Sequence, residues 1–287
     1  MSLSAALRRR EYMILITGAS GTVGRPLVEL LVDAGVKVRA VARNPAGLPR
    51  IVEVVDEPVL EGVTGLFTNP RAVGDTIDGL LAESRAAGVR RVVTLSAANV
   101  DDDLEDQPSR FRGDRNREVE RAVTASGLDW VALRPNMFAA NAFGLWAEQI
   151  RRGDVVHGPH ARATSAPIHE RDIAEVAVRA LLDDDLLGTR PVLTGPESLT
   201  QEQQVQGIGA AIGRDLTYRE VPPEAARQAM LGRGFPTGFV DGLLGIQARS
   251  VGVPAVITDE VRRILGRPAL SFARWAADNA YVFRSMP

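Results

Sequence analysis

Three glycines spaced three residues apart, Gly18, Gly21 and Gly24, point most directly to chemistry, because they lie in ITGASGTVG between an apolar stretch and a stretch with helical spacing. In such a strand-to-helix turn the first glycine permits the tight turn, the second lets a diphosphate approach the backbone, and the third lets the helix pack closely on the strand. The first N–H groups of the helix then bind phosphate. The pattern predicts a dinucleotide-binding turn, and the alternative is a tight turn that binds nothing. The other residues expected to line it are Ser20, Thr22 and Val23.

The next apolar stretch, residues 36–43, indicates which nucleotide is bound. An NAD site commonly carries Asp or Glu about twenty residues beyond the glycines, where the carboxylate holds the ribose 2′-hydroxyl. Residues 36–50 contain neither, and Arg43 ends the stretch. A guanidinium there can pair with a 2′-phosphate, so we expect NADP(H) to be preferred over NAD(H). The alternative is that Arg43 only covers the end of the sheet in solvent.

Alternating strand and helix patterns surround these residues and predict an α/β fold with a doubly wound parallel sheet and right-handed crossovers. The expected strands cover residues 12–17, 36–43, 50–56, 63–68, 90–97, 129–135 and 189–196. The expected helices cover 23–35, 75–88, 116–127, 170–184 and 199–213, the last with Thr200 as its N-cap and Gly213 at its end, and 222–251 is helical in tendency. The prolines between Arg43 and the fourth strand predict a turn where a helix would otherwise precede the third strand.

Three regions are expected from this pattern. Residues 1–12 form a flexible extension, residues 13–152 an NAD(P)-binding Rossmann region, and residues 153–287 a mixed region that returns strands and helices to the sheet. This last region is predicted to form a smaller, partly helical substrate cover at the carboxyl ends of the strands, where an open α/β sheet binds its ligand.

The order of several blocks resembles the NmrA-like atypical short-chain dehydrogenases/reductases. They are the glycine stretch, VVTLSA, VERAVTASGLDWVALRPNMFAAN, ERDIAEVA and LTGPESLT. The resemblance covers nearly the whole chain from Met13. It implies an NAD(P)-binding protein similar either to NAD(P)H-dependent quinone and azo-dye reductases or to redox-sensing regulators.

The resemblance also exposes a departure in the catalytic residues. Most short-chain dehydrogenases and sugar epimerases use a Tyr-x-x-x-Lys pair, but Tyr12, Tyr218 and Tyr281 all lie outside the segment between the fifth and sixth strands. Ser96 matches the family's serine of the fifth strand but lacks that partner. Reduction of an ordinary carbonyl forms a strongly basic alkoxide and needs a proton donor, so epimerisation and alcohol dehydrogenation are disfavoured. His169 is a second weak catalytic candidate, with a structural histidine as the alternative.

Hydride addition to a quinone or another conjugated acceptor gives a delocalised, weakly basic anion, so oriented NADPH and a dry pocket suffice, with water as the proton source. We therefore expect an NADPH-dependent reductase of a small conjugated molecule, with a non-catalytic NADP(H)-sensing regulator as the alternative. Asn69 and Pro70 follow the fourth strand, where the cofactor is expected to cross the sheet edge. The residues expected at the acceptor site, with ordinary core packing as the alternative for the aromatic ones, are Asn136, Phe138, Asn141 and Phe143.

Composition excludes several other classes of function. The 287 residues carry a formal charge of −2, which gives no reason to expect a nucleic-acid partner. There is no cysteine, and no apolar run approaches the roughly 18 residues of a membrane span. His157 and His160 have no convincing third ligand, so no metal site is expected. We expect a cytoplasmic protein whose partner is a small molecule, with a homodimer or a protein partner left open.

Overall fold

The computed structural model describes residues 12–284, which form two compact units. Unit one comprises residues 12–100, 114–134 and 173–191, and unit two comprises residues 101–113, 135–172 and 192–284. These units interleave along the chain, whereas the sequence pattern suggested the consecutive regions 13–152 and 153–287. The reason is that one strand and one helix, over 129–135 and 170–182, each begin in one unit and end in the other. Most of the expected extension, residues 1–11, lies outside the described residues.

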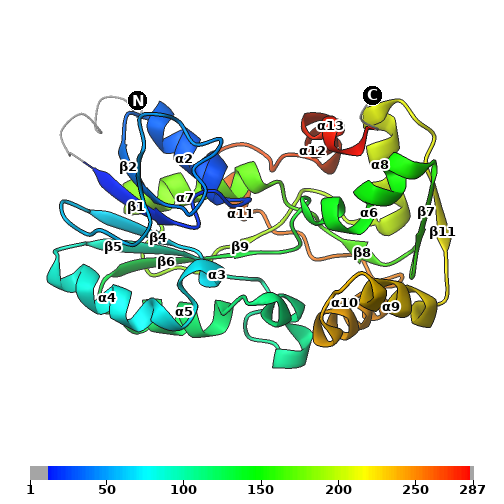
Figure 1. The fold of residues 1–287 in the computed structure, drawn as a ribbon, viewed down its shortest axis with the longest axis horizontal. Helices are drawn as coiled ribbons and strands as arrows, with labels where there is room; N and C mark the ends of the chain where they lie inside the picture. The colour runs from blue at the N-terminus through cyan, green and yellow to red at the C-terminus, as the bar shows by residue number, and fades with distance from the viewer. Residues whose placement is uncertain (1–11, 285–287) are drawn as a thin grey trace. The chain divides into compact units, whose positions relative to one another are not determined.

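A seven-stranded sheet with strand order β3-β2-β1-β4-β5-β6-β9 organises unit one, and Figure 1 shows its fan of strands. The strands are β1 (Met13–Thr17), β2 (Lys37–Val41), β3 (Glu53–Val55), β4 (Gly65–Thr68), β5 (Arg91–Leu95), β6 (Asp129–Pro135) and the short β9 (Val192–Leu193), whose two residues belong to unit two. Strands β1 to β6 pair in parallel with their neighbours in the sheet. The order reverses direction at β1, so the doubly wound α/β fold is confirmed.

Helices cover both faces of this sheet in unit one. They are α2 (Gly24–Asp33), α3 (Pro70–Val73), α4 (Ile77–Ala86), α5 (Asn116–Ala125) and α7 (Glu170–Leu182), with a 3₁₀ turn, η1 (Gly74–Thr76), before α4. In Figure 1, α2 and α7 lie on one face and α4 and α5 on the other. Leu15, Leu66 and Val92 of the sheet pack in one apolar cluster with Leu81 of α4 and Val119 of α5. Burial of this cluster holds the strand ends in a fixed register.

The connection between β2 and β3 contains no helix, as its prolines predicted. The N–H of Leu48 donates to the carbonyl of Pro45 at 3.0 Å, and the N–H of Val52 donates to that of Pro49 at 3.1 Å. These hydrogen bonds close two successive turns. The loop after Arg43 is therefore short and shaped by its own backbone.

Unit two is mainly helical. It contains α6 (Asn141–Arg152), α8 (Gln201–Ile212), α9 (Pro223–Gly232), α10 (Thr237–Arg249), α11 (Glu260–Leu265), α12 (Phe272–Asp278), α13 (Ala280–Phe283) and the 3₁₀ turns η2 (Leu104–Asp106) and η3 (Pro108–Arg112). Two small sheets join β7 (Val155–Gly158) to β11 (Thr217–Glu220) in parallel, and β8 (Thr164–Ser165) to β10 (Leu199–Thr200) in antiparallel pairing. The predicted N-cap is confirmed, because Thr200 and Gln203 form a capping box at the start of α8.

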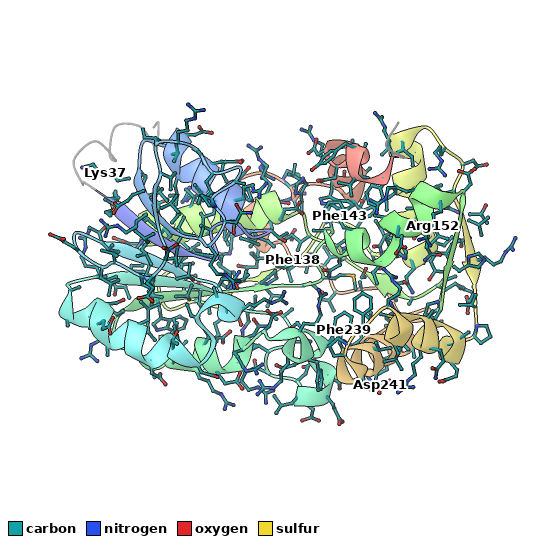
Figure 2. The ribbon with its side chains drawn as sticks, in the orientation of Figure 1. Lys37, Phe138, Phe143, Arg152, Phe239 and Asp241 are labelled. Atoms are coloured by element: carbon teal, nitrogen blue, oxygen red, sulfur yellow. The ribbon has the colours of Figure 1, made fainter. Side chains whose placement is uncertain are left out.

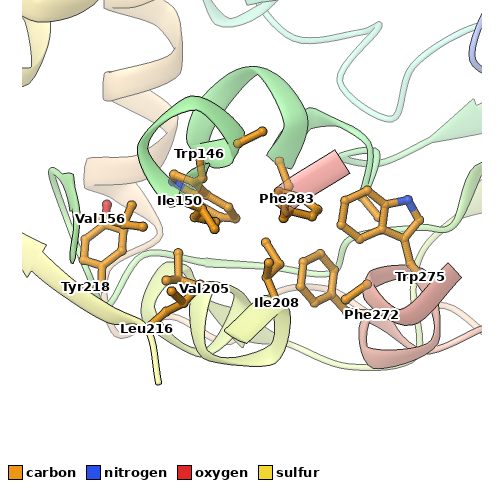
Figure 3. Packing of buried hydrophobic residues seen from close by; sticks show 14 residues of the cluster. Trp146, Ile150, Val156, Val205, Ile208, Leu216, Tyr218, Phe272, Trp275 and Phe283 are labelled. Atoms are coloured by element: carbon orange, nitrogen blue, oxygen red, sulfur yellow. The ribbon is translucent and has the colours of Figure 1, made fainter. Parts of the chain in front are cut away.

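The core of unit two is rich in aromatic residues and is drawn in Figure 3. Trp275 and Phe283 are fully buried there, together with Ile150 of α6 and Val205 of α8. Their burial fixes α12 and α13 against α6 and α8. Among residues 12–284, no helix is both long and apolar enough to cross a membrane.

Candidate functional site

The predicted glycine turn has the geometry that its spacing requires. Gly18 adopts φ 67°, a left-handed conformation, and its carbonyl accepts a hydrogen bond of 3.0 Å from the N–H of Gly21. A Cβ on Gly24 would lie 2.8 Å from the Cα of Ala19 and would clash with the carbonyl oxygen of Gly18. Helix α2 therefore approaches β1 more closely than any side chain at position 24 allows.

The outer surface of the turn is open. Ser20, Gly21 and Thr22 are exposed, and a Cβ on Gly21 would approach nothing but the carbonyl oxygen of Gly18, at 3.1 Å. Helix α2 begins with no side-chain cap and no acidic residue in its first turn. The N–H of Gly21 donates to Gly18, the N–H of Arg25 donates to Gly21, and Pro26 has no N–H. The backbone N–H groups of residues 22–24 can therefore bind the diphosphate of a dinucleotide, and this chain fits that group. Val23 is 2% exposed, so only its backbone can contribute.

The sheet register brings Asn69 beside this turn. The N–H of Asn69 donates to Oγ1 of Thr17 at 2.9 Å, and its side chain lies 3.0 Å from the position a Cβ would take on Gly18. Its Oδ1 accepts from the N–H of Arg71 and so caps α3, while Pro70 is buried at the first position of that helix. Asn69 thus lines the turn, and Pro70 shapes the backbone beside it.

Arg43 follows the end of β2 and is exposed. Within residues 12–284 its guanidinium forms no hydrogen bond or ion pair, and residues 34–52 contain no carboxylate. A cation without an internal counter-ion beside a dinucleotide turn can pair with an added phosphate. This geometry fits the predicted role of Arg43.

Ser96 lies just after β5, and its hydroxyl is hydrogen-bonded to a buried carboxylate, Glu120, that the sequence did not point to. Its Oγ donates to Oε2 of Glu120 at 2.6 Å. Both side chains are buried, Ser96 being 4% exposed and Glu120 5% exposed. Arg134 donates two further hydrogen bonds to Glu120, at 2.6 and 3.1 Å, and Arg190 donates one at 3.0 Å. The hydroxyl proton of Ser96 is therefore directed at Glu120, and the four hydrogen bonds satisfy that carboxylate.

His169 lies within unit two in a group of polar residues that we call the His169 cluster. The members of this cluster are His169, Glu170, Asp172, Arg267, Leu270, Trp275 and Asp278. Nδ1 of His169 accepts from the N–H of Arg171 at 3.1 Å, so the ring caps α7 and its proton is on Nε2, 3.5 Å from Oδ2 of Asp278. His169 is 6% exposed. Its burial and its capping of α7 explain the presence of a histidine here without a catalytic role.

Asp172 is the most deeply buried carboxylate of the His169 cluster, with no exposed surface. One oxygen accepts from the N–H of Leu270 at 2.7 Å, and the other lies 2.8 Å from the guanidinium of Arg267. Burial raises the pKa of the Asp172 carboxyl, against the opposing effects of these two groups and of His169. Glu170 accepts from the indole N–H of Trp275 at 3.2 Å. The cluster thereby ties the start of α7 to the C-terminal segment, residues 266–283.

The residues predicted at the acceptor site lie in unit two. Figure 2 labels Phe138 and Phe143 near the start of α6. The ring of Phe143 packs on Trp275, with ring centres 5.0 Å apart, and also on Phe283, so it belongs to the aromatic core. Phe138 is half-buried and its backbone bridges to that of Ile168.

The two asparagines of the predicted acceptor site differ in exposure. Oδ1 of Asn136 accepts from the N–H of Met137 at 2.7 Å, while Asn141 is exposed at the start of α6. Among the four residues predicted to line the acceptor site, Phe143 is packed as an ordinary core residue, which was the alternative considered for the aromatic ones. No group of three or more metal-ligating side chains occurs within residues 12–284.

Glu120 and Asp172 are two buried carboxylates with polar partners that the sequence pattern did not point to. Each sits on a helix among apolar neighbours, and its partners lie far away in the chain, at Ser96 and Arg190 for one and at Arg267 for the other. An acidic residue on the apolar face of a predicted helix was the one available signal, because such a carboxylate must find a partner in the core.

Comparison with known proteins identifies the family. The NAD(P)H-binding family matches residues 18–184. A (4-alkanoyl-5-oxo-2,5-dihydrofuran-3-yl)methyl phosphate reductase of Streptomyces griseus is 36% identical, over 94% of this chain and 99% of that protein. An NAD(P)H azoreductase of Xenophilus azovorans is 29% identical over the same shares. The NADPH complex of a quinone oxidoreductase, QOR2 from Escherichia coli, has the same fold, with a TM-score of 0.74 at 21% identity over 93% of this chain and 99% of that one. The resemblance noted in the sequence is confirmed.

Proposed function

The chain belongs to the NAD(P)H-binding family, and we propose that it is a reductase that transfers hydride from NADPH to a small conjugated acceptor. The observation that carries this proposal is the open glycine turn, whose backbone N–H groups at residues 22–24 and unpaired Arg43 suit a phosphorylated dinucleotide. When bound there, the cofactor would supply hydride. The residues that would hold it are Gly18, Ser20, Gly21, Thr22, Val23, Gly24, Arg43, Asn69 and Pro70.

The state of the two candidate proton donors supports a conjugated acceptor. The hydroxyl proton of Ser96 is directed at Glu120. Nδ1 of His169 accepts from the backbone N–H of Arg171 and Nε2 lies 3.5 Å from Asp278, so this ring is held as part of the fold. Hydride addition to the end carbon of a conjugated system moves the electron pair onto a carbonyl or equivalent heteroatom. The resulting anion is delocalised, and water supplies the proton that completes the reduction. The protein then contributes binding and orientation.

The relatives favour acceptors of this kind. One acts on a phosphorylated alkanoyl-dihydrofuranone, and another is named for azo compounds. Both classes offer an extended conjugated system to hydride. We propose that the acceptor of this chain is likewise a conjugated ring ketone, lactone, quinone or azo compound, and that NADPH is used in preference to NADH.

Loss of nicotinamide absorbance tests the reaction. Purified protein is mixed with NADPH or NADH and with a quinone, an azo dye or an unsaturated lactone, and a saturated ketone serves as the matched control. We expect acceptor-dependent oxidation of NADPH, slower oxidation of NADH and no oxidation with the saturated ketone. Tight NADPH binding without turnover on any acceptor would instead support the regulatory alternative, in which the cofactor is sensed and a protein partner responds.

A variant of Arg43 tests the cofactor preference separately. We expect R43A to weaken NADPH binding by about tenfold or more, since a charge-assisted contact to phosphate is lost, and to change NADH binding by less than about twofold. Equal losses for both nucleotides would exclude the 2′-phosphate role. Fluorescence titration of the reduced cofactor measures both constants.

A further inference from the structure

We propose that Arg25 binds the 2′-phosphate of NADPH together with Arg43, so that cofactor preference depends on two arginines from separate elements. This inference rests on the proposed use of NADPH. Arg25 is the second residue of α2 and directly follows Gly24. Its exposed side chain forms no hydrogen bond or ion pair within residues 12–284, and the sequence pattern did not single it out.

The guanidinium of Arg25 rests on the loop that begins with Arg43. A Cβ on Gly47 would lie 3.1 Å from Nη1 and 3.2 Å from Cζ of Arg25, so the charged group lies against the bare backbone of that glycine. Gly47 also adopts φ 83°, a conformation that other residues adopt only at a cost. The glycine therefore provides both the shape of the loop and the room for the arginine.

The loop that supports Arg25 is held in shape by its own residues. Oδ1 of Asn44 accepts a hydrogen bond of 3.0 Å from the N–H of Ala46. The carbonyl of Pro45 accepts another from the N–H of Leu48, and the ring of Pro45 fixes one backbone torsion. Arg25 and Arg43 are thus presented by the start of a helix and the end of a strand, joined through a stiff turn.

Within residues 12–284 the guanidinium groups of Arg25 and Arg43 lack an ion-pair partner. The first turn of α2 contains no acidic residue, and residues 34–52 contain none either. A cation near a helix N-terminus is disfavoured by the helix dipole, so Arg25 occupies a position that gains nothing from the helix itself. A 2′-phosphate carries close to two negative charges and can accept from both guanidinium groups, whereas the 2′-hydroxyl of NADH supplies no charge.

Calorimetric titration with adenosine 2′,5′-bisphosphate and with 5′-AMP tests the assignment without turnover, because the two ligands differ only in the 2′-phosphate. We expect R25Q to weaken binding of the bisphosphate by about tenfold or more and to change binding of 5′-AMP by less than about twofold. The matched control is R85Q, at an exposed arginine of α4 whose side chain has no described partner. R85Q should bind both ligands as the wild type does.

Thermal unfolding separates this role from a structural one. Because Arg25 lies at the disfavoured end of α2, R25Q should leave the midpoint of the free protein unchanged or raise it slightly. It should also reduce the upward shift that the bisphosphate produces. A lowered midpoint of the free protein, with an unchanged ligand shift, would assign Arg25 to stability and overturn the proposal.

A pair of glycine variants tests the contact with Gly47. In G47A a Cβ would displace the Arg25 guanidinium, and in G62A the same type of left-handed strain arises at φ 73° with open space around it. We expect G47A alone to lose part of the preference for the bisphosphate over 5′-AMP. An equal loss in both variants would trace the effect to backbone strain and not to Arg25.

The outcomes distinguish this inference from the proposed function. If the wild type binds the bisphosphate no more tightly than 5′-AMP, both the NADPH preference and the Arg25 role are wrong. If the wild type discriminates, R43Q loses the preference and R25Q retains it, then the Arg25 role alone is wrong and the proposed reductase stands. Loss of preference in both variants supports the two-arginine assignment.

Discussion

The glycine turn of unit one and the His169 cluster of unit two hold their polar groups in opposite states. At the turn, α2 begins with no side-chain cap and Arg43 has no described partner. In the cluster, Asp172 is fully buried between Leu270 and Arg267. Open polar groups at a surface turn can bind a ligand, whereas the buried hydrogen bonds of the cluster fix the chain. The comparison therefore supports the proposed binding role of the first region and explains how the second attaches the C-terminal segment.

The largest effect is expected from Gly24→Ala, which would disrupt the turn itself. The added Cβ would clash with the carbonyl of Gly18, so α2 must move away from β1. We expect the free energy of unfolding to fall by about 3 kcal/mol and cofactor binding to be lost. Urea denaturation and fluorescence titration measure the two effects.

Gly79→Ala is the control for that variant. Gly79 lies inside α4, and nothing lies within 4 Å of the position its Cβ would take. The exchange should raise the free energy of unfolding by as much as about 1 kcal/mol, because alanine favours a helix. If the two variants behaved alike, close packing at Gly24 would not explain the turn.

Asp172→Ala should have the next largest effect and should act on unit two. It removes the acceptor for the N–H of Leu270 and the partner of Arg267. We expect a loss of about 2 kcal/mol in the free energy of unfolding. Hydrogen exchange at the indole of Trp275, which is fully buried, should accelerate as the C-terminal segment detaches. Unchanged exchange there would mean that aromatic packing alone holds the segment.

The pH dependence of stability sharpens the view of Asp172. Burial raises the pKa of its carboxyl in the folded protein, so the folded chain binds this proton more readily than the unfolded chain. The wild type should therefore gain stability relative to D172N as the pH falls through the raised pKa, by at most about 1.4 kcal/mol per pH unit. Urea denaturation of both proteins between about pH 7 and about pH 4 measures the difference. A difference that moves the opposite way would show that pairing with Arg267 outweighs burial.

The smallest effect is expected at His169, where two variants separate capping from catalysis. Asn can replace Nδ1 as the acceptor for the N–H of Arg171, whereas Ala cannot. We expect H169A to lose about 1 kcal/mol in the free energy of unfolding and H169N to lose less. Both should retain acceptor-dependent NADPH oxidation. Equal and large losses of turnover in the two variants would make His169 a proton donor and overturn its structural assignment.

The sequence predicted the features that depend on local backbone rules. The strand over 129–135 and the ends of α8 at Thr200 and Gly213 are found as predicted, and the glycine turn has the predicted conformation. The strand expected over 189–196 is reduced to Val192–Leu193, because tertiary pairing and not apolar composition sets its length.

Features that depend on distant partners were not predictable in the same way. Phe143 lies on α6, and the sequence pattern predicted no helix over residues 141–152. The buried side of this helix packs in the aromatic core. Glu120 and Asp172 are held by residues many positions away in the chain. A single sequence shows how residues are spaced along the chain, but it does not show which buried charged side chains contact each other in the fold.

The interleaving of the two units also bears on how such a chain can be altered by recombination. The chain passes from one unit to the other after residues 100, 113, 134, 172 and 191. No single break therefore yields one unit as a continuous fragment, and a crossover between two genes at one point exchanges parts of both. Unit two, which contains the residues proposed to bind the acceptor, therefore cannot be exchanged as one continuous segment. Its specificity is expected to diverge by point changes within a chain inherited whole.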